Sequence, residues 1–258
     1  NFPTTPGVVQ PDLATGPATD VDIYGVDTQP NGVDCYLASF NGVDFTLEAA
    51  TYFGGSGNDG QNKAAGLNAN FGDEYRGQID IGPDGSIWIA TTTTSQDLNL
   101  PGSPAPAGSY DALVAGFSAD LSTLLCGRTF GGSAADAAYS VEVAPDNSFG
   151  AFGALQILVG GGTLSSDLPL PGGSIQPNPL GSVEGWIAQM NAGPDDLTVQ
   201  FATYHGLADY DQVYFVQRDG QGRPYAYGQA RGGMPTIGNV FSQPQSGQYI
   251  TCFLPDLS

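Results

Sequence analysis

Four copies of one seven-residue strand pattern recur along the chain, and this repetition limits the fold more than any other feature. The copies are residues 34–40 (DCYLASF), 111–117 (DALVAGF), 184–190 (EGWIAQM) and 247–253 (GQYITCF). Asp34 and Asp111 lie 77 positions apart, and Asp111 and Glu184 lie 73 positions apart. A repeat of this length has room for several short strands, so the chain is predicted to be a tandem array.

Three further strands follow the first in each repeat. The second strand ends in aromatic and glycine residues, at 51–56 (TYFGGS), 128–133 (RTFGGS) and 203–206 (TYHG). A hairpin comes next, in which two alternating runs flank a turn such as Pro-Asp-Gly, at 78–89, 140–149 and 212–228. Turns of this chemistry between alternating runs are strong hairpin signals. Each repeat then closes with a proline-containing tail, at 95–101 and 165–171.

The sequence therefore predicts an all-β fold of β-propeller type, built from four-stranded antiparallel blades. About three full repeats are expected, with partial repeats at both ends. The predicted boundaries are 1–33 for the tail and connection of a preceding repeat, 34–110 for repeat 1 with an insertion at 58–77, 111–183 for repeat 2, 184–246 for repeat 3, and 247–258 for the first strand of a further repeat. Because both ends stop inside the repeat pattern, we expect a fragment of a longer protein. Glycine (38) and proline (19) supply the many turns that such a fold requires.

The order of these motifs resembles the SBBP-type bacterial β-propeller repeat. The resemblance rests on DALVA, TFGGS, PDGS and the opening NFPTTPG, and it covers nearly the whole chain except residues 11–33 and the insertion. It implies a large secreted or cell-surface protein, and the family has no shared catalytic residues that could be carried over to this chain. Repeat 3 departs from the pattern, since Tyr204, His205 and Gly206 lack the second glycine.

The charge of the chain is strongly negative. It has 26 acidic and 6 basic residues, for a formal net charge of −20. Such a surface repels phosphate backbones and anionic lipids, so no nucleic-acid partner and no direct membrane insertion are expected. An extracellular or cell-surface location fits this composition. Cys35, Cys126 and Cys252 form neither a disulfide framework nor a paired metal motif, and we expect inert thiols.

Most residues that could carry chemistry have a structural explanation. His205, the one histidine, takes the strand-end position of Phe53 and Phe130, and it has neither a triad nor a ligand cluster around it. Trp88 and Trp186 fall at inward positions of alternating strands, which favours the core.

The recurring carboxylates are also expected to be structural. Those in the hairpin turns should hydrogen-bond their own backbone, and those that begin the first strands should cap a turn. The turn residues are Asp84, Asp146 and Asp219, and the strand-heading residues are Asp34, Asp111 and Glu184. No catalytic residue is therefore predicted, although a glycosidase built on two carboxylates stays open as an alternative.

Asp20, Asp22 and Asp27 form an oxygen-rich stretch that loosely resembles a calcium loop. The EF-hand pattern is not met, because the final glutamate is missing. No cofactor is expected, with Ca²⁺ as the one open alternative.

The insertion at 58–77 is the sharpest feature that belongs to a single repeat. The corresponding stretch of repeat 2 is much shorter, residues 134–139. Long loops on a rigid scaffold often carry binding specificity. Lys63, Phe71, Tyr75 and Arg76 are therefore candidate partner-binding residues, against the alternative of a tolerated surface insertion.

These observations favour a non-enzymatic structural or adhesive repeat module that presents loops to a protein, to a glycan or to copies of itself. Two alternatives stay open. One is an extracellular carbohydrate-active enzyme, a lyase or glycosidase, with its site in the propeller funnel. The other is a subunit of a self-assembling filament or stalk, in which open strand edges pair between chains.

Overall fold

The computed structural model of the chain describes residues 2–20, 28–70, 72–145, 155–194, 196–243, 246–255 and 257. The strands in chain order are β1 (Thr19–Asp20), β2 (Thr28–Gln29), β3 (Cys35–Phe40), β4 (Leu47–Phe53), β5 (Gln78–Ile81), β6 (Ile87–Thr93), β7 (Asp111–Phe117), β8 (Leu124–Phe130), β9 (Asp136–Pro145), β10 (Leu155–Thr163), β11 (Glu184–Ala192), β12 (Leu197–His205), β13 (Asp211–Arg218), β14 (Pro224–Ala230) and β15 (Gln248–Cys252). Within these ranges the helical structure amounts to one 3₁₀ turn, η1 (Asp73–Tyr75). The all-β prediction is confirmed.

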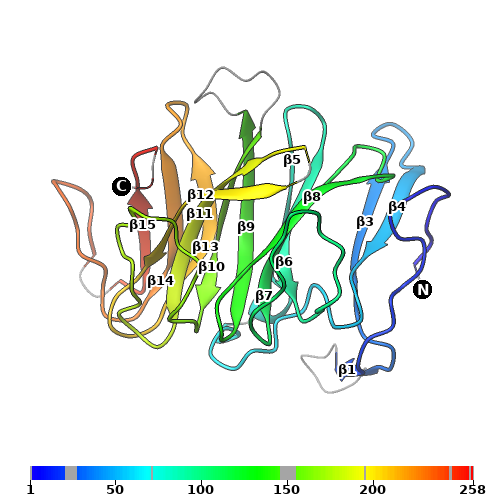
Figure 1. Cartoon of the computed structure of the whole chain (residues 1–258). Helices are drawn as coiled ribbons and strands as arrows, with labels where there is room; N and C mark the ends of the chain where they lie inside the picture. The colour runs from blue at the N-terminus through cyan, green and yellow to red at the C-terminus, as the bar shows by residue number, and fades with distance from the viewer. Residues whose placement is uncertain are drawn as a thin grey trace.

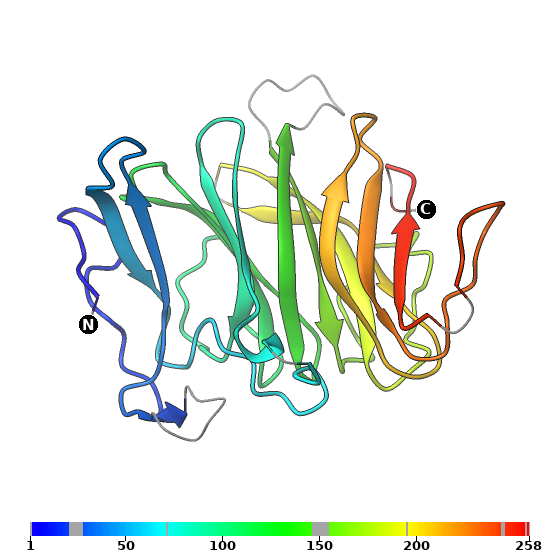
Figure 2. The same ribbon diagram turned by 180° about the vertical axis from the view of Figure 1, so that it is seen from behind.

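The sheets stand side by side in chain order, from β3–β4 near the N-terminus to β13–β15 near the C-terminus (Figures 1 and 2). Two sheets have four strands, in the orders β5-β6-β7-β8 and β12-β11-β10-β9. The sheet β13-β14-β15 has three strands, and β3-β4 and β1-β2 have two each. All pairings between these strands are antiparallel, as predicted.

The sheets and the sequence repeats are out of phase by half a unit. In the first four-stranded sheet, β6 of repeat 1 pairs with β7 of repeat 2 along the register from Ile87↔Phe117 to Thr93↔Asp111. In the second, β10 pairs with β11 in the same way, from Leu155↔Ala192 to Thr163↔Glu184. Each sheet therefore joins the hairpin of one repeat to the first two strands of the next, which ties consecutive repeats together through backbone hydrogen bonds.

The hairpin turns use the predicted chemistry. In the β5–β6 turn the Asp84 carboxylate accepts hydrogen bonds from the Ser86 backbone N–H at 3.0 Å and from its hydroxyl at 2.5 Å. Gly85 adopts a left-handed φ of 86°, which favours glycine. Asp219 accepts from the Gln221 N–H at 2.9 Å in the β13–β14 turn. The turn that contains Asp146 lies outside the described residues.

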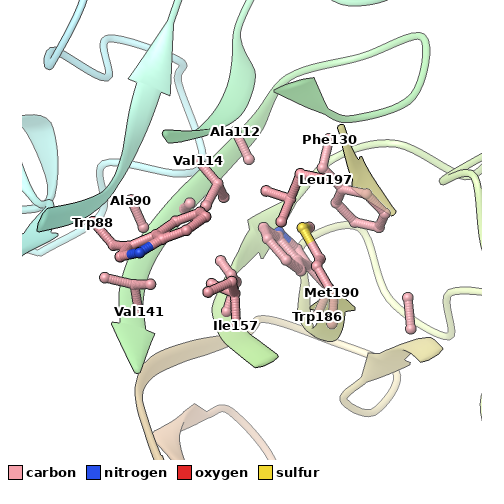
Figure 3. Close-up of a cluster of buried hydrophobic side chains, with 14 of the residues drawn as sticks. Trp88, Ala90, Ala112, Val114, Phe130, Val141, Ile157, Trp186, Met190 and Leu197 are labelled. Carbon is pink, nitrogen blue, oxygen red and sulfur yellow. The ribbon is translucent and has the colours of Figure 1, made fainter. Parts of the chain in front are cut away.

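The largest apolar core lies between the two four-stranded sheets (Figure 3). Trp88 from β6 and Trp186 from β11 are fully buried in it, as predicted, and Phe130 of β8 packs against Trp186 at a tilt, with ring centroids 4.8 Å apart. Both indoles lie against glycine on the neighbouring strand, Trp88 against Gly116 and Trp186 against Gly161. The two sheets thus share one core.

The proline-containing tails run along the last strand of a sheet. The Thr5 N–H donates to the carbonyl of Ala50 in β4 at 3.1 Å, and the Tyr204 N–H in β12 donates to the carbonyl of Gln176 at 3.2 Å. The tail of repeat 3 differs, because Ile237 and Phe241 are 88% and 95% exposed. The N-terminal segment thus runs along β4 as the segment around Gln176 runs along β12.

Candidate functional site

The carboxylates that begin the first strands hold the loops that precede them. Asp34 accepts a hydrogen bond from the Ala14 N–H at 2.8 Å, and Asp111 accepts one from the Gly108 N–H at 3.2 Å. Glu184 accepts from the N–H groups of Leu180 and Gly181 at 2.6 and 2.5 Å. Asp111 and Glu184 thus cap the turns that precede them, as the sequence predicted, whereas Asp34 holds a more distant part of the chain.

A second set of three carboxylates, which the sequence analysis missed, lies beside the first. Asp59, Asp136 and Asp211 are almost fully buried. Each accepts a hydrogen bond from the backbone N–H four residues earlier, at 2.9, 2.8 and 2.6 Å respectively. The available signal was this constant position, since an aspartate follows the aromatic-glycine ending at the same distance in all three repeats.

The two sets meet in pairs across a glycine. In repeat 2 a methyl group added to Gly131 would collide with both Asp111 and Asp136, so the two carboxylates face each other over its Cα. Burial, with a smaller contribution from the neighbouring Asp111, raises the pKa of Asp136 to about 7. The same arrangement recurs at Gly54 and Gly206. Because the pairs recur, are buried and accept hydrogen bonds from the backbone, we assign them a structural role.

His205 is buried at the end of β12. Its Nε2 lies 2.9 Å from the Thr251 hydroxyl, and its ring packs against Tyr249 and Phe253 with centroids 5.2 and 5.1 Å away. Burial lowers the pKa of the imidazole to about 4, so it is neutral at physiological pH. His205 thus lies at the packing position that the sequence predicted from Phe53 and Phe130.

The insertion at 58–77 folds back onto the sheets instead of extending into solvent. Lys63 pairs with Glu74 at 3.5 Å, and Arg76 pairs with the buried carboxylate of Asp73 at 3.4 Å. The Arg76 guanidinium lies over the Tyr214 ring of β13, 4.4 Å from its centroid. The two candidate cations are thus held by partners within the chain.

The other two candidates of the insertion differ from these cations. Tyr75 is 41% exposed, while Phe71 lies outside the described residues. Among the described residues, the four candidates therefore do not form one shared binding surface.

The insertion also joins β9 to β13. The Tyr139 hydroxyl of β9 donates to the Leu67 carbonyl at 2.8 Å, and the Asn70 amide donates to the hydroxyls of Tyr214 and Tyr210 at 2.6 and 3.1 Å. Leu67 itself is fully buried. The insertion therefore connects two neighbouring sheets through hydrogen bonds. It also forms a fixed surface beside repeat 3, which we call the wall.

Arg76→Ala is expected to destabilise the protein by about 2 kcal/mol, because it removes the cation–π contact and leaves the buried Asp73 without its cation. Lys63→Ala is the matched control, since its ion pair is half-exposed and contributes little. Urea unfolding of the two variants and the parent measures the difference. Equal stability of the Arg76 variant and the parent would contradict the assigned role.

An open pocket of about 450 Å³ lies between this wall and repeat 3. Its lining includes Asn70 of the insertion, Tyr210, Gln229, Arg231, Ser246 and Gln248. The Arg231 guanidinium lies 5.1 Å from the centroid of the Tyr210 ring, and the Arg231 N–H donates to the Tyr210 carbonyl at 2.8 Å. Amides, hydroxyls and one exposed guanidinium give this pocket a largely polar lining.

The calcium prediction falls mostly on residues outside the described ranges, since these omit Asp22 and Asp27. Asp20 is exposed and accepts a hydrogen bond from the Thr28 hydroxyl at 2.8 Å. Among the residues that the structure describes, no group of three histidine, cysteine, aspartate or glutamate side chains is arranged to hold a metal ion. A calcium site in the 20–27 stretch stays a prediction.

The described part of the chain holds no helix that is long and apolar enough to cross a membrane. No protein-family model matches the chain, and no curated protein matches it. The pocket is therefore described from its own geometry.

Proposed function

We propose that this chain is part of a β-propeller-type repeat array in a secreted or cell-surface bacterial protein, where it serves as a non-enzymatic adhesive module that binds a glycan. The propeller assignment is supported by repeated antiparallel sheets that stand in chain order and share a core. It is also supported by the motif order of the SBBP-type repeat. The strongly acidic composition fits an extracellular setting.

The pocket between the insertion and repeat 3 is the observation that carries the proposal. Its volume of about 450 Å³ lies within the usual range for small-ligand sites. Carboxamides such as those of Gln229 and Gln248 both donate and accept hydrogen bonds, as a sugar bearing several hydroxyl groups requires. Part of the pocket lining comes from the insertion at 58–77, which the other repeats lack. The pocket is therefore a feature of this chain and not of the repeat in general.

A non-enzymatic role is favoured by the way the carboxylates are used. General acid–base catalysis needs a carboxyl group within reach of its substrate. The pairs Asp111–Asp136 and Glu184–Asp211 are buried and accept hydrogen bonds from backbone N–H groups. These carboxylates therefore serve to hold the loops that connect the strands.

Ser246→Tyr is expected to abolish glycan binding, because the larger side chain fills the pocket. Tyr110 stands at the corresponding position at the end of repeat 1, directly before Asp111, so the repeat accepts a tyrosine there. The measurement is a glycan-array screen of the parent, followed by titration calorimetry of the parent and the variant with the glycan found. Ser109→Tyr, at an exposed serine of another loop, is the control and should bind like the parent.

Two results would overturn this proposal. One is a parent protein that binds no glycan on arrays of plant, algal and bacterial sugars. The other is a Ser246→Tyr variant that is folded and binds as tightly as the parent, since the ligand would then occupy another part of the molecule.

A further inference from the structure

The pocket lies where repeat 3 departs from repeat 2 at two positions. The strand registers Thr163↔Asp136 and Ala230↔Asp211 place Leu164 and Arg231 at corresponding sites. The N–H groups of both donate to the carbonyl of the residue before that aspartate, in each case at 2.8 Å. On the neighbouring strand, Val183 and Glu184 correspond to Ser246 and Gly247, since Glu184 pairs with Thr163 and the Ala230 N–H donates to the Gly247 carbonyl at 3.1 Å.

In repeat 2 this place is filled by apolar side chains. Leu164 and Val183 lie against the insertion at Gly66, where an added methyl group would touch them at 3.5 and 3.7 Å. Val183 also belongs to a buried cluster with Leu67. In repeat 3 a guanidinium and a small hydroxyl replace these side chains, so the corresponding place is open and polar.

The same exchange changes the local charge in one direction. Leu164 of repeat 2 is neutral, whereas Arg231, at the corresponding position of repeat 3, has a formal charge of +1. The pocket thus gains one unit of positive charge in a chain whose net charge is −20. A local reversal of this kind favours an anionic ligand over a neutral one.

Arg231 also differs from most of the other basic residues in having no carboxylate partner. Four of them form ion pairs with an acid of the chain: Lys63, Arg76, Arg218 and Arg223. Arg128 donates to the Leu197 carbonyl at 3.2 Å. Among the carboxylates that the structure describes, none lies within ion-pair distance of Arg231, whose guanidinium rests on Tyr210 beside the pocket.

We propose that the pocket binds a carboxylate-bearing sugar of the uronic-acid class, with the carboxylate on Arg231. The planar guanidinium matches a carboxylate through two parallel hydrogen bonds. Gln229 and Gln248 line the same pocket and would bond the ring hydroxyls, and Asn70 of the insertion completes the lining. This inference rests on the proposed glycan-binding function and names its substrate class.

The test is titration calorimetry with oligogalacturonate and with a neutral galacto-oligosaccharide of equal length. The parent is expected to bind the acidic oligomer, and Arg231→Leu, which introduces the repeat 2 residue, should weaken that binding by about 10- to 100-fold. Any weak binding of the neutral oligomer should stay unchanged. Arg223→Leu is the matched control, because Arg223 is exposed, lies in the β13–β14 hairpin and is already paired with Asp219. It should bind like the parent.

The outcomes separate this inference from the proposal on which it rests. If the neutral oligomer binds, Ser246→Tyr blocks it and the acidic oligomer does not bind, the uronic-acid inference is overturned while glycan binding stands. Equal affinity of Arg231→Leu and the parent for the acidic oligomer would also overturn it. If neither oligomer nor any array glycan binds the parent, both proposals fail.

Discussion

Raising the pH from about 5 to about 8 should remove stability on the order of 3 kcal/mol through the buried carboxyl of Asp136. Its pKa is raised from 3.8 to about 7, first by burial and then by Asp111 across Gly131. Between these two values the folded protein binds more protons than the unfolded chain. Stability from this group is therefore complete below about pH 4 and declines as the pH rises through the folded pKa.

Urea unfolding of the parent and Asp136→Asn at several pH values between about 5 and 8 measures this effect. The amide side chain has the same shape and keeps an oxygen for the Gly132 N–H, so the variant should have a much flatter pH profile. Asp120→Asn is the control, since Asp120 is exposed and its hydrogen bonds to Ser118 and Ser122 lower its pKa to about 2. An unchanged slope in Asp136→Asn would show that Asp136 is ionised in the fold throughout this range.

The strands could be predicted because their signals are local. Alternation and turn chemistry around Asp84 and Asp219 determine where the chain reverses, and the structure has hairpins at both places. The inward positions of Trp88 and Trp186 follow from the two-residue period of a strand. These features depend on a few neighbouring residues, which a single sequence displays in full.

The phase of the sheets could not be predicted in the same way. A tandem repeat looks alike wherever its boundary is drawn, so the sequence does not say whether β7 pairs with the hairpin before it or the hairpin after it. The register Ile87↔Phe117 settles this in favour of the preceding hairpin. The paired acids Asp111 and Asp136 were missed for a related reason, because they face each other only through the backbone of Gly131.

The candidate site depended on contacts that sequence spacing does not reveal. The insertion stands out in the sequence because the other repeats lack it. Its spacing does not show, however, that Arg76 is held by Asp73 and by the ring of Tyr214 in a distant strand. The pocket combines Asn70 with Arg231, which lie far apart in the chain. The substitution of Arg231 for Leu164 is visible in the sequence, yet its meaning requires the strand register that aligns them.

Trp186→Ala should destabilise the protein by about 4 kcal/mol, because it empties the centre of the core that the two four-stranded sheets share. The indole is fully buried, packs against the ring of Phe130 and donates its N–H to the Gly162 carbonyl at 3.2 Å. Urea unfolding gives the loss, and Phe241→Ala serves as the control because that ring is 95% exposed and should change stability by less than about 0.5 kcal/mol.

Amide hydrogen exchange of the same variant shows how far the damage extends. Trp186 lies in β11, whereas its neighbour Phe130 lies in β8 of the other sheet, so removal of the indole should lower protection in both sheets together. Loss of protection confined to β9–β12, with β5–β8 unchanged, would show that each sheet is stable without its neighbour. That result would contradict a tandem array in which a sheet buries its faces by stacking on the next.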